Sequence, residues 1–350
     1  MSDTPKNVAV TKTDPIAHAI ERLQSSRSPV LGVVSDDGSL VGTFSDQDAR
    51  EAMIRNVVEH GLIEGVMNKR PLFSARTASK SALRKMMVER KVPAIALTEG
   101  KRFVGIEQLD DSGRGPLSGA VAVIMAGGRG QRLRPLTDKV PKPLLKVGSS
   151  SILERIVRAI ADCGITKVYM SVNYKARVFE QALKDGSHLG VEIEYLKEQI
   201  KLSTAGALSL IPETPKGPVL VTNADILTRL DFKRMLEFHW SKGTDATVAA
   251  SRYFAPIKYG VIHTEGTRLI EMEEKPMLRV LCNAGIYVLA PKVLRLLKKD
   301  EPLAMPDLLS RMREKDMQVD VFPIFEKWFD IGSPEDFQKV LLEFATGEEE

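Results

Sequence analysis

The stretch that decides the fold runs from Gly127 to Leu145 and reads GGRGQRLRPLTDKVPKPLL. It follows AVAVIMA, an apolar run from Ala120 with the length of a buried strand. Glycines let the backbone approach a ligand closely, and their successive N–H groups can face phosphate oxygens. Five cationic side chains lie within the next residues: Arg129, Arg132, Arg134, Lys139 and Lys142. The segment therefore predicts a loop that binds a polyphosphate at the end of a strand.

This glycine pattern differs from the two most familiar phosphate-binding motifs. It lacks the Gly-Lys-Ser/Thr of a Walker loop, and Leu133 occupies the third glycine position of the GxGxxG dinucleotide pattern. The loop therefore indicates a polyphosphate site of another kind. A glycine turn with a purely structural role is the alternative for the glycines alone.

Beyond this loop the sequence alternates between strand-like and helix-like segments. The strand-like runs are AVAVIMA, KVYMSVNY, VEIEYLKE, PVLVTNAD and ATVAASRY. A helix is predicted in SILERIVRAIADCG, where Ser150 or Ser151 can cap the start and Gly164 can end it. Another is predicted in DFKRMLEFHWSKG. This order predicts an α/β fold with a doubly wound, mainly parallel sheet, whose ligands bind beyond the carboxyl ends of the strands.

A smaller unit precedes this region. Helix-like ALRKMMVERKVP (from Ala82) repeats AIERLQSSRSP (from Ala19) at a spacing of about 63–64 residues. Each is followed by two apolar runs around a short turn, which is typical of a hairpin. The Gly/Ser/Pro-rich SGRGPLSG marks the boundary. We therefore expect a small α/β domain in residues 1–112, a linker in 113–119 and the larger domain in 120–350.

The paired unit resembles the CBS domain, which normally works as a tandem pair. Ser45-Asp46-Gln47-Asp48 is similar to the family's Ser/Thr-x-x-Asp, which implies that Ser45 and Asp48 hold an adenosine ribose. The second repeat has Gln108-Leu109-Asp110-Asp111 there, so at most one adenosyl site is complete. An adenine nucleotide is thus an expected partner. A pair that serves only packing or dimerisation is the alternative, since Ser-x-x-Asp is also an ordinary helix start.

The larger region resembles the sugar-1-phosphate nucleotidyltransferases, whose signature is G-G-x-G-x-R-L-x-P-L-T…P-K-P. The resemblance continues through Glu198, Thr204-Ala205-Gly206, Asn223-Ala224-Asp225, Tyr259-Gly260-Val261, Glu274-Lys275-Pro276, Asn283-Ala284-Gly285 and Asp330-Ile331-Gly332. It implies an enzyme that joins a nucleoside triphosphate to a sugar 1-phosphate and releases pyrophosphate. A sugar phosphate is already a good nucleophile near neutrality, so no general base is needed.

The resemblance also implies roles for individual residues. Arg132, Lys142, Asp225 and Lys275 would be catalytic, with Lys275 on the sugar phosphate. The nucleotide would contact Ala126, Gly127, Gly128, Gly130, Glu198 and Gly206. The sugar phosphate would contact Gly260, Glu274, Lys275 and Asn283. Ser203 stands where the family usually has glycine, which leaves the shape of the base pocket open.

Magnesium is the expected cofactor. The family uses a pair of aspartates at the positions of Asp225 and Asp330. Hard carboxylates suit Mg²⁺, which commonly binds one or two of them together with substrate phosphates. Asp225 taken alone would be a helix cap or a turn acid in most proteins.

Composition excludes several other classes. Lys and Arg total 50 against 46 Asp and Glu, spread evenly, so no nucleic-acid-binding surface is expected. Cys163 and Cys282 have no metal-type spacing. The N-terminal stretch has no apolar signal region, and no run is long enough for a bilayer. We expect a cytoplasmic protein without membrane partners that forms a homo-oligomer.

GTP is the expected nucleotide and a hexose or hexosamine 1-phosphate the expected sugar, because the domain order resembles bacterial guanylyltransferases of GDP-mannose or legionaminic acid biosynthesis. Uridylyl, thymidylyl or cytidylyl transfer is the alternative within the enzyme class. A nucleotide-sensing regulator without catalysis is the alternative outside it. The joint presence of Arg132, Lys142, Asp225, Lys275 and Asp330 disfavours the regulator.

Overall fold

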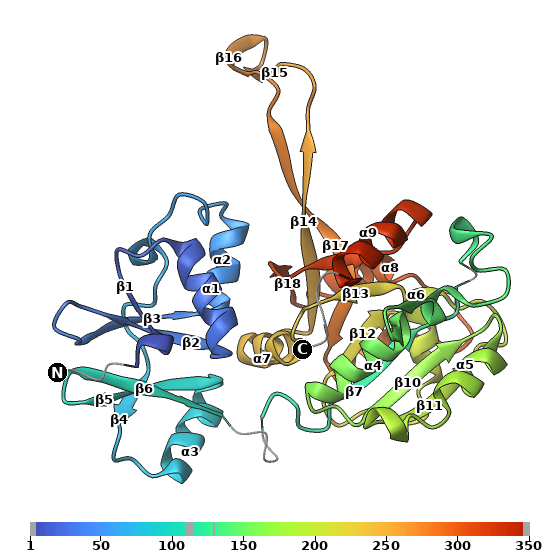
Figure 1. Cartoon of the computed structure of the whole chain (residues 1–350), viewed down its shortest axis with the longest axis horizontal. Coiled ribbons are helices and arrows are strands. Elements are labelled where there is room, and N and C mark those ends of the chain that lie inside the picture. Colours follow the sequence, from blue (N-terminus) through green and yellow to red (C-terminus); the bar gives the residue numbers. More distant parts are fainter. Residues whose placement is uncertain (1–4, 110–114, 129, 346–350) are drawn as a thin grey trace.

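The computed structural model describes residues 5–109, 115–128 and 130–345 (Figure 1). Residues 5–109 form a small N-terminal module, and residues from 115 onward form a larger α/β region. Helix α7 of the larger region lies against the module (Figure 1). Within the described residues, no helix is long and apolar enough to cross a membrane.

The N-terminal module consists of two similar units, as the sequence repeat predicts. The first contains β1 (Ala9–Thr11), α1 (Ile16–Ser26), β2 (Val30–Val34) and β3 (Leu40–Ser45), followed by α2 (Asp46–Ile54). The second contains β4 (Phe73–Ala75), α3 (Lys80–Arg90), β5 (Ala94–Glu99) and β6 (Arg102–Gln108). Each unit has a three-stranded sheet with one parallel pair and one antiparallel hairpin. The predicted acids Asp110 and Asp111 of the second unit lie outside the described residues.

The larger region is built on a seven-stranded sheet in the order β11-β10-β7-β12-β17-β14-β18. Its strands are β7 (Val121–Met125), β10 (Lys167–Val172), β11 (Glu192–Lys197), β12 (Val219–Asn223), β14 (Ala246–Pro256), β17 (Met277–Leu289) and β18 (Val319–Ile324). Four of the six pairings are parallel, and only β17 runs against its neighbours. The predicted mainly parallel sheet is confirmed.

Helices cover both faces of this sheet, which confirms the doubly wound arrangement. The helices are α4 (Ile152–Asp162), α5 (Ala176–Leu183), α6 (Ser203–Gly206), α7 (Phe232–Lys242), α8 (Met305–Arg313) and α9 (Pro334–Ala345). Successive strand residues point to opposite faces. Ala122 and Ile124 of β7 therefore join the core under α4, α5 and α7, while Val123 joins the core under α6 and α8.

The caps of α4 follow from its sequence. Ser151 Oγ accepts a hydrogen bond from the Glu154 N–H, and the Glu154 carboxylate accepts one from the Ser151 N–H. This capping box satisfies donors that a helix start leaves unpaired. Gly164, just after the helix, has a φ of 96°, which is unfavourable for residues with a Cβ. The predicted start and stop are both confirmed.

Three short strand pairs complete the region: β8 (Lys146–Val147) with β9 (Ser150–Ser151), β13 (Ile226–Thr228) with β19 (Trp328–Asp330), and β15 (Val261–Glu265) with β16 (Arg268–Glu273). The β15–β16 hairpin lies at the end of a long two-stranded extension of β14 and β17. We call residues 252–282 the arm. Its end projects away from the rest of the chain (Figure 1), while Arg279, nearer the base, forms an ion pair with Glu59 of the N-terminal module at 3.0 Å.

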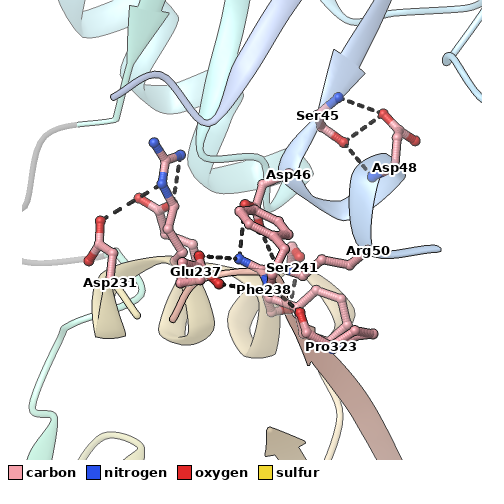
Figure 2. A network of polar contacts seen from close by, with 12 residues as sticks. Ser45, Asp46, Asp48, Arg50, Asp231, Glu237, Phe238, Ser241 and Pro323 are labelled. Atoms are coloured by element: carbon pink, nitrogen blue, oxygen red, sulfur yellow. Dashed lines mark hydrogen bonds and ion pairs between the residues drawn. The ribbon is translucent and has the colours of Figure 1, made fainter. Parts of the chain in front are cut away.

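The N-terminal module and the larger region share a buried interface. Arg50 of α2 is 1% exposed and lies over the rings of Phe322 and Phe325, 3.5 Å and 4.3 Å from their centroids. It donates hydrogen bonds to Asp46, to the Pro323 carbonyl and to Glu326 (Figure 2). Because Pro323 lies on β18, α2 covers the edge strand of the seven-stranded sheet.

Candidate active site

A large cavity lies at the carboxyl edge of the sheet, where a doubly wound fold places its ligands. It has a volume of about 800 Å³. It is bounded by the loop after β7, the end of β12 and the loop after β11. Its lining includes Ala126, Gly127, Gly128, Gly130, Arg132, Lys142, Glu198 and Asp225 from the predicted site. Arg129 lies outside the described residues.

The glycines of the loop after β7 meet two different demands. Gly130 has a φ of 60°, and a Cβ there would lie 3.1 Å from the Cβ of Lys142. At Gly127, a Cβ would lie 2.8 Å from Oε1 of Glu198. Gly130 thus provides the loop conformation, and Gly127 lets two segments approach each other. The loop can therefore present its backbone N–H groups to the cavity.

Lys142 and Asp225 form an ion pair in this cavity. The Lys142 Nζ lies 2.6 Å from Oδ2 of Asp225, and the lysine is 8% exposed. Asp225 lies two residues after the end of β12, and Lys142 begins a short 3₁₀ turn at residues 142–144. A buried ammonium group is costly unless it is paired. The pair therefore fixes a positive charge and a carboxylate at one end of the phosphate loop.

Asp330 lies beside this pair. It is opposite Ile226 in the β13–β19 ladder, and the Ile331 N–H donates to the Asp225 carbonyl at 3.3 Å. Desolvation and the negative charge of Asp225 raise the pKa of Asp330, while the charges of Lys142 and Arg132 oppose the shift. Two carboxylates so close together repel each other unless a cation lies between them.

This arrangement fits a magnesium ion that takes further ligands from a substrate. Among the described residues, no group of three or more His, Cys, Asp or Glu side chains could hold a metal. Mg²⁺ needs only one or two carboxylates when phosphate oxygens complete its shell. Asp225 and Asp330 therefore provide a partial site that a bound triphosphate would complete.

Glu198 has hydrogen-bond partners that its sequence position does not reveal. Its Oε1 accepts from the Ser171 hydroxyl at 2.5 Å, and its Oε2 accepts from the Leu202 N–H at 2.8 Å. The first contact ties the start of the loop after β11 to β10, and the second is made within that loop. In the part of the chain that the structure describes, the contacts of Glu198 shape the cavity wall. Its predicted contact with the base of the nucleotide stays a prediction.

Gly206 lies behind the cavity wall. A Cβ on it would lie 2.5 Å from the Glu301 carbonyl, and its N–H donates to the Leu303 carbonyl at 3.0 Å. The glycine therefore permits close packing of α6 against residues 301–303. Ser203 and Thr204, earlier in the same turn, line the cavity instead.

Ser203 holds a backbone conformation that favours glycine, with a φ of 66°. A left-handed residue with a Cβ costs roughly 1–2 kcal/mol, and the added chain entropy of an unfolded glycine offsets part of this. We therefore expect Ser203→Gly to increase the free energy of unfolding by about 0.5–1 kcal/mol, measured by urea denaturation. Ser203→Ala, which keeps the Cβ, is the control and should give no gain. An equal gain from both variants would contradict the strain.

The predicted sugar-phosphate residues are divided between two places. Asn283 lies at the base of the arm, where its Nδ2 donates to the Tyr287 hydroxyl at 2.8 Å and its Oδ1 accepts from the Gly285 N–H at 2.9 Å. Gly260, Glu274 and Lys275 lie on the outer part of the arm and do not line the cavity. Lys275 is eight residues beyond Asn283, which corresponds to ~26 Å along a strand. This chain alone therefore does not bring them to its own cavity.

Sequence reasoning did not single out three polar residues of the cavity: Gln131, within the glycine-rich segment, Asn173 and Lys201. Asn173 comes directly after β10, which is the neighbour of β7. Since parallel strands end at one edge, its position after an apolar run was the available signal. Lys201 lies in an irregular loop, and no local pattern identifies it.

A second cavity, of about 740 Å³, lies between the N-terminal module and α7. Ser45 and Asp48 both line it, together with Arg234, Glu237 and Phe238 of α7 (Figure 2). Ser45 caps α2, its hydroxyl donates to Asp48 at 2.6 Å, and burial raises the pKa of Asp48. The two predicted ligand residues thus share a cavity, and they also form an ordinary capping box.

The buried carboxyl of Glu237, in the wall of this second cavity, should make the stability of the protein depend on pH. Burial raises the pKa of this carboxyl from 4.5 to about 7. The folded chain therefore holds a proton that the unfolded chain releases between these values, so this contribution to stability falls as pH rises from 4.5 to 7. In the wild-type chain, this group should lower the free energy of unfolding by on the order of 3 kcal/mol between pH 4.5 and pH 7. Glu237→Gln should abolish this decrease. Urea denaturation at both pH values measures it. Glu314→Gln, at an exposed position, should leave the pH profile unchanged.

Comparison with known proteins agrees with this arrangement. The family model described as nucleotidyl transferase matches residues 121–346, and the CBS domain model matches residues 3–55. A mannose-1-phosphate guanyltransferase from Pichia angusta is 36% identical over 236 residues, covering 61% of each chain. One from Saccharomyces cerevisiae is 35% identical over 224 residues, covering 61% of this chain and 62% of that protein.

The chain spans about three fifths of the length of these curated relatives. Among solved structures, HddC from Yersinia pseudotuberculosis has the same fold with a TM-score of 0.51 and 23% identity, covering 64% of this chain and 99% of that one. The family match covers well over half of the sequence, in the region that builds the cavity. The chain therefore belongs to the nucleotidyl transferase family and carries a CBS domain ahead of its nucleotidyl transferase domain.

Proposed function

We propose that this protein transfers a nucleotidyl group from GTP to a hexose or hexosamine 1-phosphate, giving a GDP-sugar and pyrophosphate. The observation that carries the proposal is the meeting of the glycine loop and the Lys142–Asp225 pair at one cavity, with Asp330 near enough for the charge of Asp225 to raise its pKa. The relatives named above support guanylyl transfer, because they are mannose-1-phosphate guanyltransferases. The domain limits 1–112, 113–119 and 120–350 remain part of this proposal.

In this reaction an oxygen of the sugar phosphate attacks the α-phosphorus of the triphosphate. A new P–O bond forms as the bond to the leaving pyrophosphate breaks, so no proton need be removed from the nucleophile. What the protein must supply is positioning of two anions and compensation of their charge. The glycine loop and Arg132 would hold the triphosphate, Lys142 would lie at the reacting phosphates, and Lys275 would hold the sugar phosphate.

Asp225 and Asp330 would hold Mg²⁺. When bound, the ion would compensate charge on the phosphates. The two aspartates would otherwise repel each other, as the raised pKa of Asp330 indicates. This agrees with a site that is occupied when the triphosphate is bound.

The test is a matrix of five nucleoside triphosphates against common sugar 1-phosphates, with Mg²⁺ and with EDTA, in which pyrophosphate release is measured. The proposal expects the highest rate with GTP and no turnover with EDTA. A higher rate with UTP, dTTP or CTP would favour the other transferase classes. Nucleotide binding without pyrophosphate release from any pair would favour the non-catalytic regulator.

We also propose that the second cavity binds an adenine nucleotide. Ser45 and Asp48 line it together with Arg234, and Arg70, Arg90 and Lys91 add positive charge. Calorimetry of the full chain with ATP, ADP and AMP tests this. Binding that Asp48→Ala abolishes supports it, while identical titrations of both proteins would leave the module a packing unit.

A further inference from the structure

The arm exposes an unusual amount of apolar surface. Of the 21 exposed large hydrophobic residues among those described, eleven lie on it: Tyr253, Phe254, Tyr259, Ile262, Leu269, Ile270, Met272, Met277, Leu278, Val280 and Leu281. Single exposed apolar residues are normal, but contiguous groups of this kind mark interaction surfaces. An isolated two-stranded ribbon is also only marginally stable in water. The arm therefore requires a partner surface.

The arm begins at the same sheet edge as the active-site cavity. Strand β17 runs antiparallel to β12, so the start of its paired segment lies beside the end of β12, next to Asp225. Pairing of β17 with β12 ends at Ile286, and pairing of β14 with β18 ends at Ser251. Beyond these points, in the described chain, β14 and β17 pair only with each other. The arm thus leaves the molecule at the cavity but leads away from it (Figure 1).

The ladder within the arm opposes folding back onto the same cavity. β14 and β17 form seven consecutive pairs from Ala250↔Asn283 to Pro256↔Met277. A return to its own cavity would break or sharply bend this ladder. The outer arm nevertheless carries Gly260, Glu274 and Lys275, which the proposed function requires at a cavity.

The rim of the active-site cavity complements the arm. Three large apolar side chains near it are exposed, Leu136, Val140 and Ile200, at 46%, 39% and 47%. The loop after β7 carries four described cations, Arg132, Arg134, Lys139 and Lys142. The end of the arm carries four carboxylates, Glu265, Glu271, Glu273 and Glu274, together with three cations, Lys258, Arg268 and Lys275. The match between the two surfaces is therefore one of exposed apolar groups.

We propose that the arm of each chain closes the active-site cavity of a second copy and supplies Lys275 and Glu274 to it. Only another copy of this chain carries the residues that this cavity lacks. The exchange is reciprocal, as expected for a two-fold dimer. The arm comprises residues 252–282, and about 20–30 residues per partner form a standard stable interface. The assignment of Lys275 rests on the proposed function; the docking of the arm does not.

A cross-linking experiment tests the docking without any assay of activity. Two full-length copies with different affinity tags are co-expressed and purified over both tags. One copy carries Lys258→Arg and Lys275→Arg, so its arm has no reactive lysine. The other carries Lys139→Arg and Lys201→Arg, which leaves these two rim lysines only in the first copy. In the mixed pair, a link between an arm lysine and Lys139 or Lys201 can then form only between chains, and these are the arm-to-rim links that are counted.

Arm-to-rim links in the co-purified pair, found by mass spectrometry, are the expected result. Such links in the wild-type protein but none in the mixed pair would show that the arm folds onto its own chain. The absence of arm-to-rim links in both, or failure of the two copies to co-purify, would also overturn the proposal.

Complementation then tests the role of Lys275. Lys142→Ala and Lys275→Ala are each expected to lack activity alone. If arms are exchanged, a mixed dimer has one site with both lysines, so random pairing restores about a quarter of the wild-type rate. Arg132→Met, at an exposed position, replaces Lys142→Ala if that variant fails to fold. Sites built within one chain would restore nothing. Cross-links without restored activity would support docking of the arm on a second copy and would contradict the proposed role of Lys275.

Discussion

Asp225→Asn is expected to lower pyrophosphate release by at least about 100-fold, as removal of one preorganised electrostatic group typically does. The substitution keeps the shape of the side chain and removes its charge. It thereby removes one of the two proposed magnesium ligands and the partner of Lys142, whose Nζ lies 2.6 Å away. Lys142 would then be free to move from its position beside the phosphate loop.

The variant should also change how the protein responds to magnesium. With the wild-type chain, Mg²⁺ and GTP together should raise the melting temperature more than GTP alone, because a ligand that binds only the folded state stabilises it. Asp225→Asn should abolish the additional increase. The removal of a neighbouring negative charge should at the same time lower the pKa of Asp330, since Asp225 helps to raise it.

Asp316→Asn is the matched control. Asp316 is exposed, it lies outside the cavity, and its φ of 53° is one that asparagine also tolerates. This control should keep the wild-type rate and the wild-type response to magnesium. Wild-type turnover in Asp225→Asn would refute the proposed role of Asp225 in catalysis and metal binding.

Much of the larger region could be predicted because its strands are nearly continuous apolar runs. β7, β10, β12 and the first half of β14 lie where such runs occur, since burial on both faces leaves little polar sequence within them. The edge strand β11, EIEYLK, is less buried and mixes charged with apolar residues. The residues that follow these strands were predictable for the same reason. Lys142 and Asp225, 83 positions apart, meet because β7 and β12 are parallel neighbours.

The arm could not be predicted in the same way. Residues 261–273 are not among the strand-like runs of the sequence, and the structure contains β15 and β16 there. Local alternation decides which side chains share a face, but it does not decide where the hairpin lies relative to the cavity. The predicted role of Lys275 on the sugar phosphate therefore comes from its motif alone. Its distance from Asn283 depends on the length over which β14 and β17 remain paired.

Arg50 illustrates a second limit. In the sequence it looks like an exposed arginine that pairs with Asp46 one turn earlier. Its burial depends on Phe322, Phe325 and Glu326, which lie more than 270 positions away. No local pattern contains that information.

Arg50→Ala is expected to be the most destabilising of the single substitutions considered, with a loss of about 3–5 kcal/mol in the free energy of unfolding. Most of this cost arises from the partners left behind. The carboxylates of Asp46 and Glu326 have side chains only 14% and 12% exposed, so each would be a poorly solvated charge without its cation. The Pro323 carbonyl would lose a donor as well.

The two tryptophans allow this prediction to be measured at the interface itself. Trp240 of α7 packs against the core of the second unit of the module, and Trp328 lies two residues after Glu326. Urea unfolding followed by tryptophan fluorescence should therefore report separation of the module from the larger region. In Arg50→Ala, we expect this change at lower urea than in the wild-type chain.

Arg55→Ala is the control for the loss of an arginine from the region of α2 outside the buried interface with β18. Arg55 is the exposed residue that ends the same helix, so its loss should cost less than about 0.5 kcal/mol. Equal unfolding curves for Arg50→Ala and Arg55→Ala would mean that the buried ion pair does not hold the interface together. A large difference would identify Arg50 as the principal polar link between the module and β18. Because Glu326 precedes Asp330 by four residues on the same segment, that link also supports the strand that carries the proposed metal ligand.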